Sequence, residues 1–173
     1  NTSPFTMTNL LKQKWLEVYP EEPKKIFGID VNAPALTALS SLQQEGILSL
    51  VVFEHEKPYV AKGLIDMVDI TSFVMDFFEN YDDVVTVKTF ETLFERRLKN
   101  KEVGSLMNFS GMNLYEPIDK KATFAEVLDV LSRAGIHRAP ILKQKNCIRL
   151  ITQSDVLHFI SSHLDTFGDI LDL

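Results

Sequence analysis

An internal repeat is the feature that most constrains how this chain can fold. The first matched stretch of each copy opens with an Ile-Asp pair, continues with apolar residues at helical spacing and ends on Gly-Ile. This stretch runs from Ile29 to Ile47 in the first copy and from Ile118 to Ile136 in the second, 89 positions later and without an insertion. Matched spacing over so many positions indicates a duplicated supersecondary unit.

A second matched stretch follows in each copy. Leu64 to Phe73 matches Leu150 to Phe159, now 86 positions apart, so the second copy is three residues shorter. The difference falls between Phe53 and Lys62, where residues 54–58 are polar and are interpreted as a turn. Turns tolerate such changes of length better than helices and strands do.

Both copies predict the same order of elements, β-α-β-β-α, with the Ile-Asp pair in the first strand. In the first copy the pattern predicts a helix over 34–45 ended by Gly46, strands over 47–53 and 59–65, and a helix from Asp69 to Phe78. In the second copy it predicts a helix over 124–134, strands over 139–142 and 147–151, and a helix from Asp155 to Leu164. One such unit leaves apolar surface uncovered. The predicted fold class is therefore α/β (α+β), with tandem βαββα motifs packed as a pseudo-twofold pair.

Two further helices are expected outside the motifs, over 9–18 and 89–101. The basic cluster at 96–101 is interpreted as the solvated side of the second of these helices. The predicted boundaries are 1–80 for the first motif with its N-terminal helix, 81–102 for a helical linker, and 103–173 for the second motif with a C-terminal tail. All three segments are expected to form one compact module.

Composition excludes several classes of partner. The net charge of −6 argues against nucleic acid, whose phosphates require a basic face. No apolar run approaches the length of a membrane span, and residues 1–10 lack the layout of a signal peptide. The single cysteine, Cys147, excludes an internal disulfide and fits a reducing compartment, so a cytoplasmic location is expected, with the nucleus as the alternative.

The sequence also lacks the usual motifs of catalysis. It has no Gly-rich phosphate loop, no nucleophile elbow and no Cys-His pair of suitable spacing. His158 and His163 are five positions apart on a predicted helix and so face different sides, which makes them a poor metal pair. We therefore expect no enzyme, no metal site and no bound cofactor.

Two motifs of the second copy carry a family resemblance: Gly135-Ile136-His137-Arg138-Ala139-Pro140-Ile141, and Leu150-Ile151-Thr152-Gln153-Ser154-Asp155. Together they resemble the signature of the CBS-domain pair, or Bateman module, over roughly residues 20–165. The His-Arg-x-Pro segment and the helical insert between the copies resemble most the gamma subunit of AMP-activated protein kinase and its yeast and plant relatives.

The resemblance implies that a cleft between the two halves binds an adenine nucleotide (AMP, ADP or ATP) or S-adenosylmethionine. In the second copy, Asp155 would accept hydrogen bonds from the ribose hydroxyls, and Thr152 would reach ribose or phosphate. His137 and Arg138 would donate to phosphate oxygens. The residues expected around the adenine ring are Ile118, Ile136, Pro140 and Ile151.

Each of these polar residues also has a purely structural interpretation. In this interpretation Asp155 is simply a helix N-cap, and Thr152 is an ordinary residue at a strand end. His137 alone is more often a satisfied histidine of the surface or core. Arg138 is harder to explain structurally, because a buried guanidinium without a partner is unfavourable, so it meets either an acidic side chain or an anion.

The first copy departs from the pattern. Its Thr position is Asp66, which would repel a phosphate, and its His-Arg position is Leu48-Ser49. We therefore expect at most one competent site per chain, with Asp69 as the centre of a second, weaker one. Lys57 and Lys62 are the distant cations that such a weaker site would use.

Three hypotheses of function follow. The first is a regulatory module, similar to a kinase gamma subunit, that binds AMP, ADP or ATP and signals to a protein partner such as kinase subunits. The second is a structural or dimerisation scaffold with degenerate sites. The third is a module for S-adenosylmethionine, whose sulfonium would suit Asp66 but not Arg138. Because gamma subunits carry two such pairs in one chain, a homodimer that forms a four-CBS disc is expected here.

Overall fold

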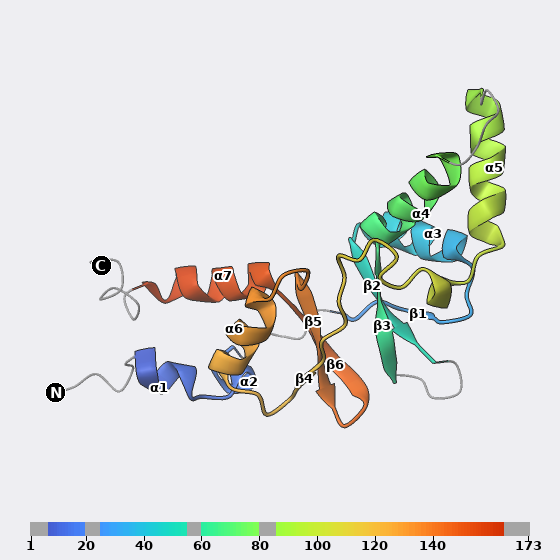
Figure 1. Ribbon diagram of the computed structural model, residues 1–173. Helices are drawn as coiled ribbons and strands as arrows, with labels where there is room; N and C mark the ends of the chain where they lie inside the picture. The colour runs from blue at the N-terminus through green and yellow to red at the C-terminus, as the bar shows by residue number, and fades with distance from the viewer. Residues whose placement is uncertain (1–6, 20–24, 55–59, 80–85, 165–173) are drawn as a thin grey trace. The chain divides into compact units, whose positions relative to one another are not determined.

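The computed structural model describes residues 7–19, 25–54, 60–79 and 86–164 (Figure 1). It divides the chain into two compact units, one of residues 25–115 and the other of residues 1–24 together with 116–173. Each unit contains a three-stranded sheet and several helices, so the predicted α/β (α+β) class is confirmed. The packing of the two motifs against each other stays a prediction.

The unit of residues 25–115 holds the first copy of the repeat. Its strands are β1 (Gly28–Asp30), β2 (Ser49–Phe53) and β3 (Ala61–Asp66), in that order across the sheet, with β1 parallel and β3 antiparallel to β2. Its helices are α3 (Ala35–Glu45), α4 (Met67–Glu79) and α5 (Val87–Lys99), followed by the 3-10 turn η1 (Val103–Ser105). Gly46 ends α3 as predicted, with a φ of 63°, a left-handed conformation that glycine adopts without steric strain.

The other unit holds the second copy. Its strands are β4 (Ile118–Asp119), β5 (Arg138–Lys143) and β6 (Asn146–Thr152), again in chain order, with β4 parallel and β6 antiparallel to β5. Its helices are α1 (Met7–Leu11), α2 (Trp15–Val18), α6 (Phe124–Ser132) and α7 (Gln153–Ser162). The helix expected over 9–18 is therefore two short helices.

The duplication is reproduced in the strand register. Ser49, the first residue of β2, pairs with the last residue of β3, and Arg138, the first residue of β5, pairs with the last residue of β6. The ladders also shift at matched positions, after Val52 in one sheet and after Ile141 in the other. Bulges are features that related structures keep, so the two units are copies of one motif down to this irregularity.

The segments that lead into the two motifs are exchanged between the units. Lys14, ahead of the first motif, forms an isolated bridge with Thr123 of the second, and Glu102, ahead of the second motif, bridges Pro34 of the first. A matched backbone hydrogen bond lies beside each bridge: the Phe124 N–H donates to the Gln13 carbonyl (2.9 Å), and the Ala35 N–H donates to the Lys101 carbonyl (2.7 Å). The repeat thus extends further towards the N-terminus than the Ile-Asp pair that marks it in the sequence.

This exchange changes the predicted boundaries. The prediction groups the N-terminal helix with the first motif, over residues 1–80, whereas α1 and α2 lie beside α6 of the second motif (Figure 1). The physical reason is Trp15, which is 1% exposed and stacks on Tyr19 and Phe124 with ring centroids 4.8 and 5.3 Å away. Likewise α5, predicted to belong to a linker, packs on α3 and buries Leu98 in the core of the first motif.

Each unit has its own apolar core. In the first motif the core includes Ile29, Ala35, Ala38, Leu39, Leu42, Leu50, Val52, Ile65, Ile70, Phe73, Leu98, Val103 and Leu106. In the second it includes Leu10, Trp15, Tyr19, Ile118, Phe124, Val127, Leu131, Ile136, Ala139, Ile141, Ile151, Val156 and Phe159. None of the helices that the structure describes is both long and apolar enough to span a bilayer.

One strand position shows how the copies have diverged. In β3 it is Gly63, where a Cβ would lie 2.5 Å from the sulfur of Met107. In β6 it is Arg149, whose guanidinium donates to the carbonyl of Tyr19 (3.0 Å) and lies over its ring (4.9 Å from the centroid). In both units the lead-in segment therefore packs on this strand position. In the first motif the lead-in residue Met107 covers the strand glycine, and in the second the strand residue Arg149 covers the lead-in residue Tyr19.

Candidate functional site

The polar residues predicted for the second copy meet at one end of its sheet. Arg138 begins β5 and pairs in register with Thr152, the last residue of β6. Helix α7 begins directly after Thr152 and carries Asp155 in its first turn. His137 precedes β5. The structure thus brings all four residues together, because the register of one hairpin and the start of one helix place them.

Thr152 and Asp155 form a capping box. The Thr152 hydroxyl donates to Asp155 Oδ2 (2.7 Å), and the Thr152 N–H donates to the same oxygen (2.8 Å). In return, the Asp155 N–H donates to the Thr152 hydroxyl oxygen (3.2 Å). Thr152, the last residue of β6, is thus the N-cap of α7, whereas Asp155, predicted as the N-cap, is the acidic N3 residue of the box. Both residues therefore have a structural role, and the box holds the carboxylate against the end of β6.

Arg138 lacks such a partner within the described ranges. Its side chain is half-buried, and its Nε is buried without a hydrogen-bond acceptor among the described residues. The sequence left two possibilities for this guanidinium, an acidic side chain or an anion, and no described acid forms an ion pair with it. A buried N–H without an acceptor is unfavourable by about 1–3 kcal/mol, so this end of the sheet favours an anion.

His137 lies at the exposed rim of this group. Its Nδ1 is 3.4 Å from Oε1 of Gln153, whose amide nitrogen donates to the carbonyls of Leu131 (2.9 Å) and Ile136 (3.2 Å). Gln153 therefore joins the end of α6 to the start of α7 and holds His137 beside the site. Sequence reasoning missed this role, although Gln153 stands inside the quoted motif.

The four residues predicted around an adenine ring are buried in the second unit. Ile118, Ile136 and Ile151 are 4%, 2% and 1% exposed and belong to its apolar core, and Pro140 is buried in β5. Within the unit these side chains therefore serve the core. Their contact with a nucleotide base stays a prediction.

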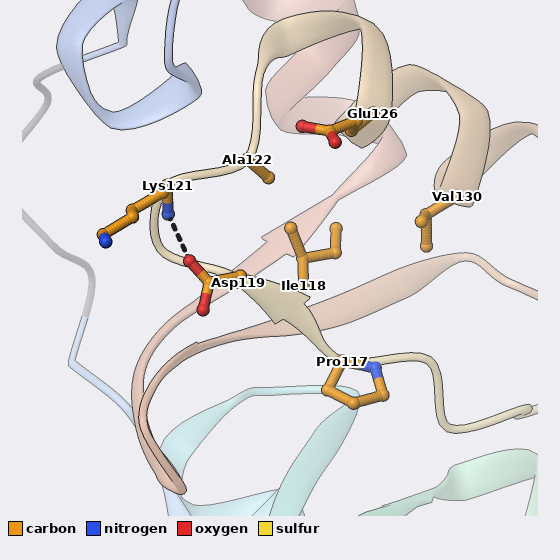
Figure 2. A pocket seen from close by; sticks show the side chains of 7 residues that line it. All are labelled: Pro117, Ile118, Asp119, Lys121, Ala122, Glu126 and Val130. Carbon is orange, nitrogen blue, oxygen red and sulfur yellow. Dashed lines mark hydrogen bonds between the residues drawn. The ribbon is translucent and has the colours of Figure 1, made fainter.

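A pocket of about 330 Å³ opens between β4 and α6 (Figure 2). It is lined by Pro117, Ile118, Asp119, Lys121, Ala122, Glu126 and Val130. Of the predicted contacts only Ile118 lines it. The volume is at the lower end of the range for small-molecule sites.

Hydrogen bonds hold the polar rim of this pocket. The Lys121 N–H donates to Asp119 Oδ1 (2.8 Å), the bond drawn in Figure 2. Glu126 Oε2 accepts from the N–H (2.7 Å) and the hydroxyl (3.0 Å) of Thr123, and these two bonds lower the pKa of Glu126. The Thr-x-x-Glu spacing that signals this cap is visible in the sequence, whereas the hollow beside it is not.

Among the described residues, the first copy has no comparable group. Asp66 stands where Thr152 stands in the second copy, and its Oδ1 caps α4 by accepting from the N–H groups of Val68 (2.8 Å) and Asp69 (3.0 Å). Ser49 replaces Arg138. The carboxylate of Asp69 is 0% exposed and already hydrogen-bonded, so the structure does not support an open site around it.

The cations predicted for that weaker site give it no support either. Lys62 forms an ion pair with Glu54 (3.1 Å), and Lys57 lies outside the described residues.

Over the described ranges, no group of three His, Cys, Asp or Glu side chains is placed to hold a metal ion. Cys147 is buried, and burial raises the pKa of its thiol to about 11, so the thiol is protonated at neutral pH.

A family model and several solved structures are similar to this chain. The family model of the CBS domain matches residues 115–162. No curated protein sequence matches the chain. One similar solved structure is the CBS domain of a CBS domain-containing membrane protein from Sphaerobacter thermophilus, with a TM-score of 0.65 and 13% identity over 88% of this chain and 90% of that one.

Two other solved structures agree. CbpB in complex with c-di-AMP has a TM-score of 0.59 and 21% identity, over 92% of this chain and 91% of that one. A CBS domain-containing protein from Kribbella flavida has a TM-score of 0.60 and 17% identity, over 81% and 94%. At these identities the likeness concerns the fold, and it extends over both units. The chain therefore has the fold of CBS-domain structures and contains a CBS domain at residues 115–162.

Proposed function

We propose that this chain is a regulatory, non-catalytic module that binds an adenine nucleotide beside Arg138, Thr152 and Asp155. The observation that carries the proposal is the Nε of Arg138, which is buried without an acceptor among the described residues. A phosphate oxygen supplies that acceptor, and a guanidinium recognises phosphate through directed, charge-assisted hydrogen bonds.

The neighbours of Arg138 suit the rest of such a ligand. Asp155 is held by its cap within the same group of residues, and a carboxylate accepts hydrogen bonds from ribose hydroxyls. His137 is exposed at the rim and offers a further donor. CbpB, which has a similar fold, binds c-di-AMP, a ligand that also combines adenine, ribose and phosphate.

AMP, ADP and ATP are the ligands we propose first, because the His-Arg-x-Pro segment resembles the gamma subunit of AMP-activated protein kinase. Ligand binding would shift the populations of the module's conformations, and a partner protein, for example a set of kinase subunits, would respond to that shift. A homodimer with four CBS motifs and a cytoplasmic location belong to the same proposal.

A scaffold without a ligand is the second candidate. It is favoured by the first copy, where Asp69 is fully buried and engaged by the chain itself. S-adenosylmethionine is a third, and its cation would gain nothing from Arg138.

Isothermal titration with AMP, ADP, ATP, c-di-AMP and S-adenosylmethionine distinguishes these candidates. A nucleotide should bind the wild-type chain, and Arg138→Ala should weaken it about tenfold or more, because a charge-assisted hydrogen bond is lost. Arg133→Ala is the matched control, since Arg133 lies in the same unit but pairs with Asp129 on the surface (2.6 Å). It should leave the affinity unchanged.

The other outcomes assign the other functions. Binding of S-adenosylmethionine alone, unaffected by Arg138→Ala, would support the third candidate. A folded protein that binds none of the five ligands would support the scaffold.

A further inference from the structure

The carboxylate of Asp69 is bound by a segment that follows it by 41 to 44 residues. Ser110 donates to Asp69 Oδ1 twice, from its N–H (3.0 Å) and from its hydroxyl (2.7 Å). The side-chain amide of Asn113 donates to Oδ2 (3.0 Å), which also accepts from the N–H of Asp66 (3.2 Å). Four donors thus converge on one carboxylate that is 0% exposed.

The segment of residues 108–113, here called the strap, is shaped for this contact. Asn108 and Gly111 adopt left-handed conformations (φ 53° and 71°), which are accessible to these two residue types. The side-chain oxygen of Asn108 accepts from the N–H of Asn113 (2.8 Å), and the Ser110 hydroxyl oxygen accepts from the N–H of Met112 (3.2 Å). Asn113 itself is 5% exposed. The two hydrogen bonds within the strap hold its backbone in the conformation that contacts Asp69.

We propose that the strap is an internal occupant of the ligand position of the first copy. Asp69 and Asp155 are matched residues of the repeat, each in the first turn of the helix that follows the third strand. If Asp155 receives ribose hydroxyls, as in the proposed function, then the Ser110 hydroxyl and the Asn113 amide supply the equivalent donors to Asp69. The chain therefore binds one nucleotide, at the second copy, and fills the first position with its own side chains.

Two further features keep the position closed to a nucleotide. Asp66, 6% exposed, stands next to Asp69 and adds a negative charge that disfavours phosphate. Phe109 of the strap packs edge-on against Phe73 of α4, with ring centroids 5.6 Å apart. An incoming ribose would have to replace all the strap's hydrogen bonds and also detach this aromatic contact.

The strap also fixes the start of the connection to the second unit. Only Leu114 and Tyr115 separate it from Glu116, where that unit begins again, and the Tyr115 hydroxyl donates to the carbonyl of Ala61 (3.1 Å). The connection is thus anchored to the first motif at two points, at Asp69 and at Ala61. Release of Asp69 would loosen the segment that leads into β4.

Carboxylate footprinting tests the occupancy of Asp69 without any nucleotide. Carbodiimide coupling followed by mass spectrometry should leave Asp69 unmodified in the wild-type chain, while the exposed Asp76 on the same helix reacts. The double variant Ser110→Ala, Asn113→Ala should raise the rate at Asp69 about tenfold or more, because strap release exposes the carboxylate. Ser105→Ala is the matched control, since its hydroxyl donates to Glu102 O (2.7 Å) and, among the described residues, makes no hydrogen bond with Asp69. It should leave the rate at Asp69 unchanged.

A rate at Asp69 equal to that at Asp76 in the folded wild-type chain would overturn the proposal. If the double variant does not fold, hydrogen exchange of the wild-type chain decides instead. The Ser110 amide should then be protected as well as the amides of β2, and rapid exchange there would contradict a closed strap.

Titration separates this proposal from the proposed function. Wild-type protein should bind one equivalent of nucleotide, lost in Arg138→Ala, and a second equivalent lost in Asp69→Asn would refute the strap as an occupant. If no nucleotide binds at all, the proposed function fails, whereas the footprint of Asp69 still decides whether the strap closes its position.

Discussion

Arg138 and Thr152 face each other as the first residue of β5 and the last residue of β6, and their counterparts Ser49 and Asp66 face each other at the same register in the first copy. One position of the motif thus carries a cation and a hydroxyl in one unit, and a hydroxyl and a carboxylate in the other. The fold is duplicated, whereas the chemistry at its strand ends is not. This difference is why we assign a ligand to the second copy and an internal occupant to the first.

Replacement of Trp15 should unfold the second unit preferentially. Trp15→Ala removes the aromatic side chain that joins the lead-in segment to Phe124 and Phe159, and large-to-small changes of this kind destabilise by about 3–5 kcal/mol. Chemical denaturation followed by circular dichroism measures the loss. Val87→Ala, at a side chain 78% exposed, should cost less than about 0.5 kcal/mol. Equal stability of the two variants would refute the exchange of lead-in segments.

The two capping boxes of the second unit give a matched pair of variants. Asp155→Ala and Glu126→Ala each remove the acidic member of a box, and each should cost about 0.5–2 kcal/mol of unfolding free energy. Only Asp155→Ala should also abolish nucleotide binding. If Glu126→Ala abolishes it instead, the ligand occupies the pocket between β4 and α6.

Gly63→Ala should destabilise the first unit by about 1–3 kcal/mol, because the new Cβ would lie 2.5 Å from the Met107 sulfur. The flexible thioether limits this cost, so Met107→Ala in the same chain should restore some of the stability. A double-mutant cycle by urea denaturation measures the coupling. Strictly additive effects would show that Met107 does not pack on this strand position.

The buried thiol of Cys147 should make stability depend on alkaline pH. Burial raises its pKa from 9.0 to about 11, so the folded state holds its proton in a range where the unfolded state loses it. Stability contributed by this group is present below pH 9 and falls as the pH rises from 9 to 11. Denaturation curves of the wild-type chain and Cys147→Ala should diverge in this window. Parallel curves would contradict the burial of the thiol.

Much of the fold follows from local pattern in the sequence. The repeat, Gly46 and the apolar runs predict the βαββα order, and most of the predicted ends lie within two or three residues of those observed. The helix starts differ because Asp66 and Thr152, the last residues of their strands, act as caps for α4 and α7.

Tertiary relationships were beyond the reach of such patterns. The segment around Trp15 precedes the first motif in the chain, yet Trp15 stacks on Phe124 of the second motif. This packing depends on side chains more than 100 residues apart, which no local pattern reports. The contact between the strap and Asp69 could not be predicted from the sequence either, because Ser110 and Asn113 are residue types that are common in loops and only the fold brings them to Asp69. Arg138 was found because a cation between apolar neighbours is unusual in any context.

A crystal structure of the chain with its nucleotide tests the central claim most directly. The account predicts a phosphate oxygen within hydrogen-bond distance of Arg138 Nε, with the ribose hydroxyls on Asp155 and the strap still closed over Asp69. A nucleotide that leaves Arg138 Nε unbound, whether in the pocket between β4 and α6 or at Asp69, would contradict it.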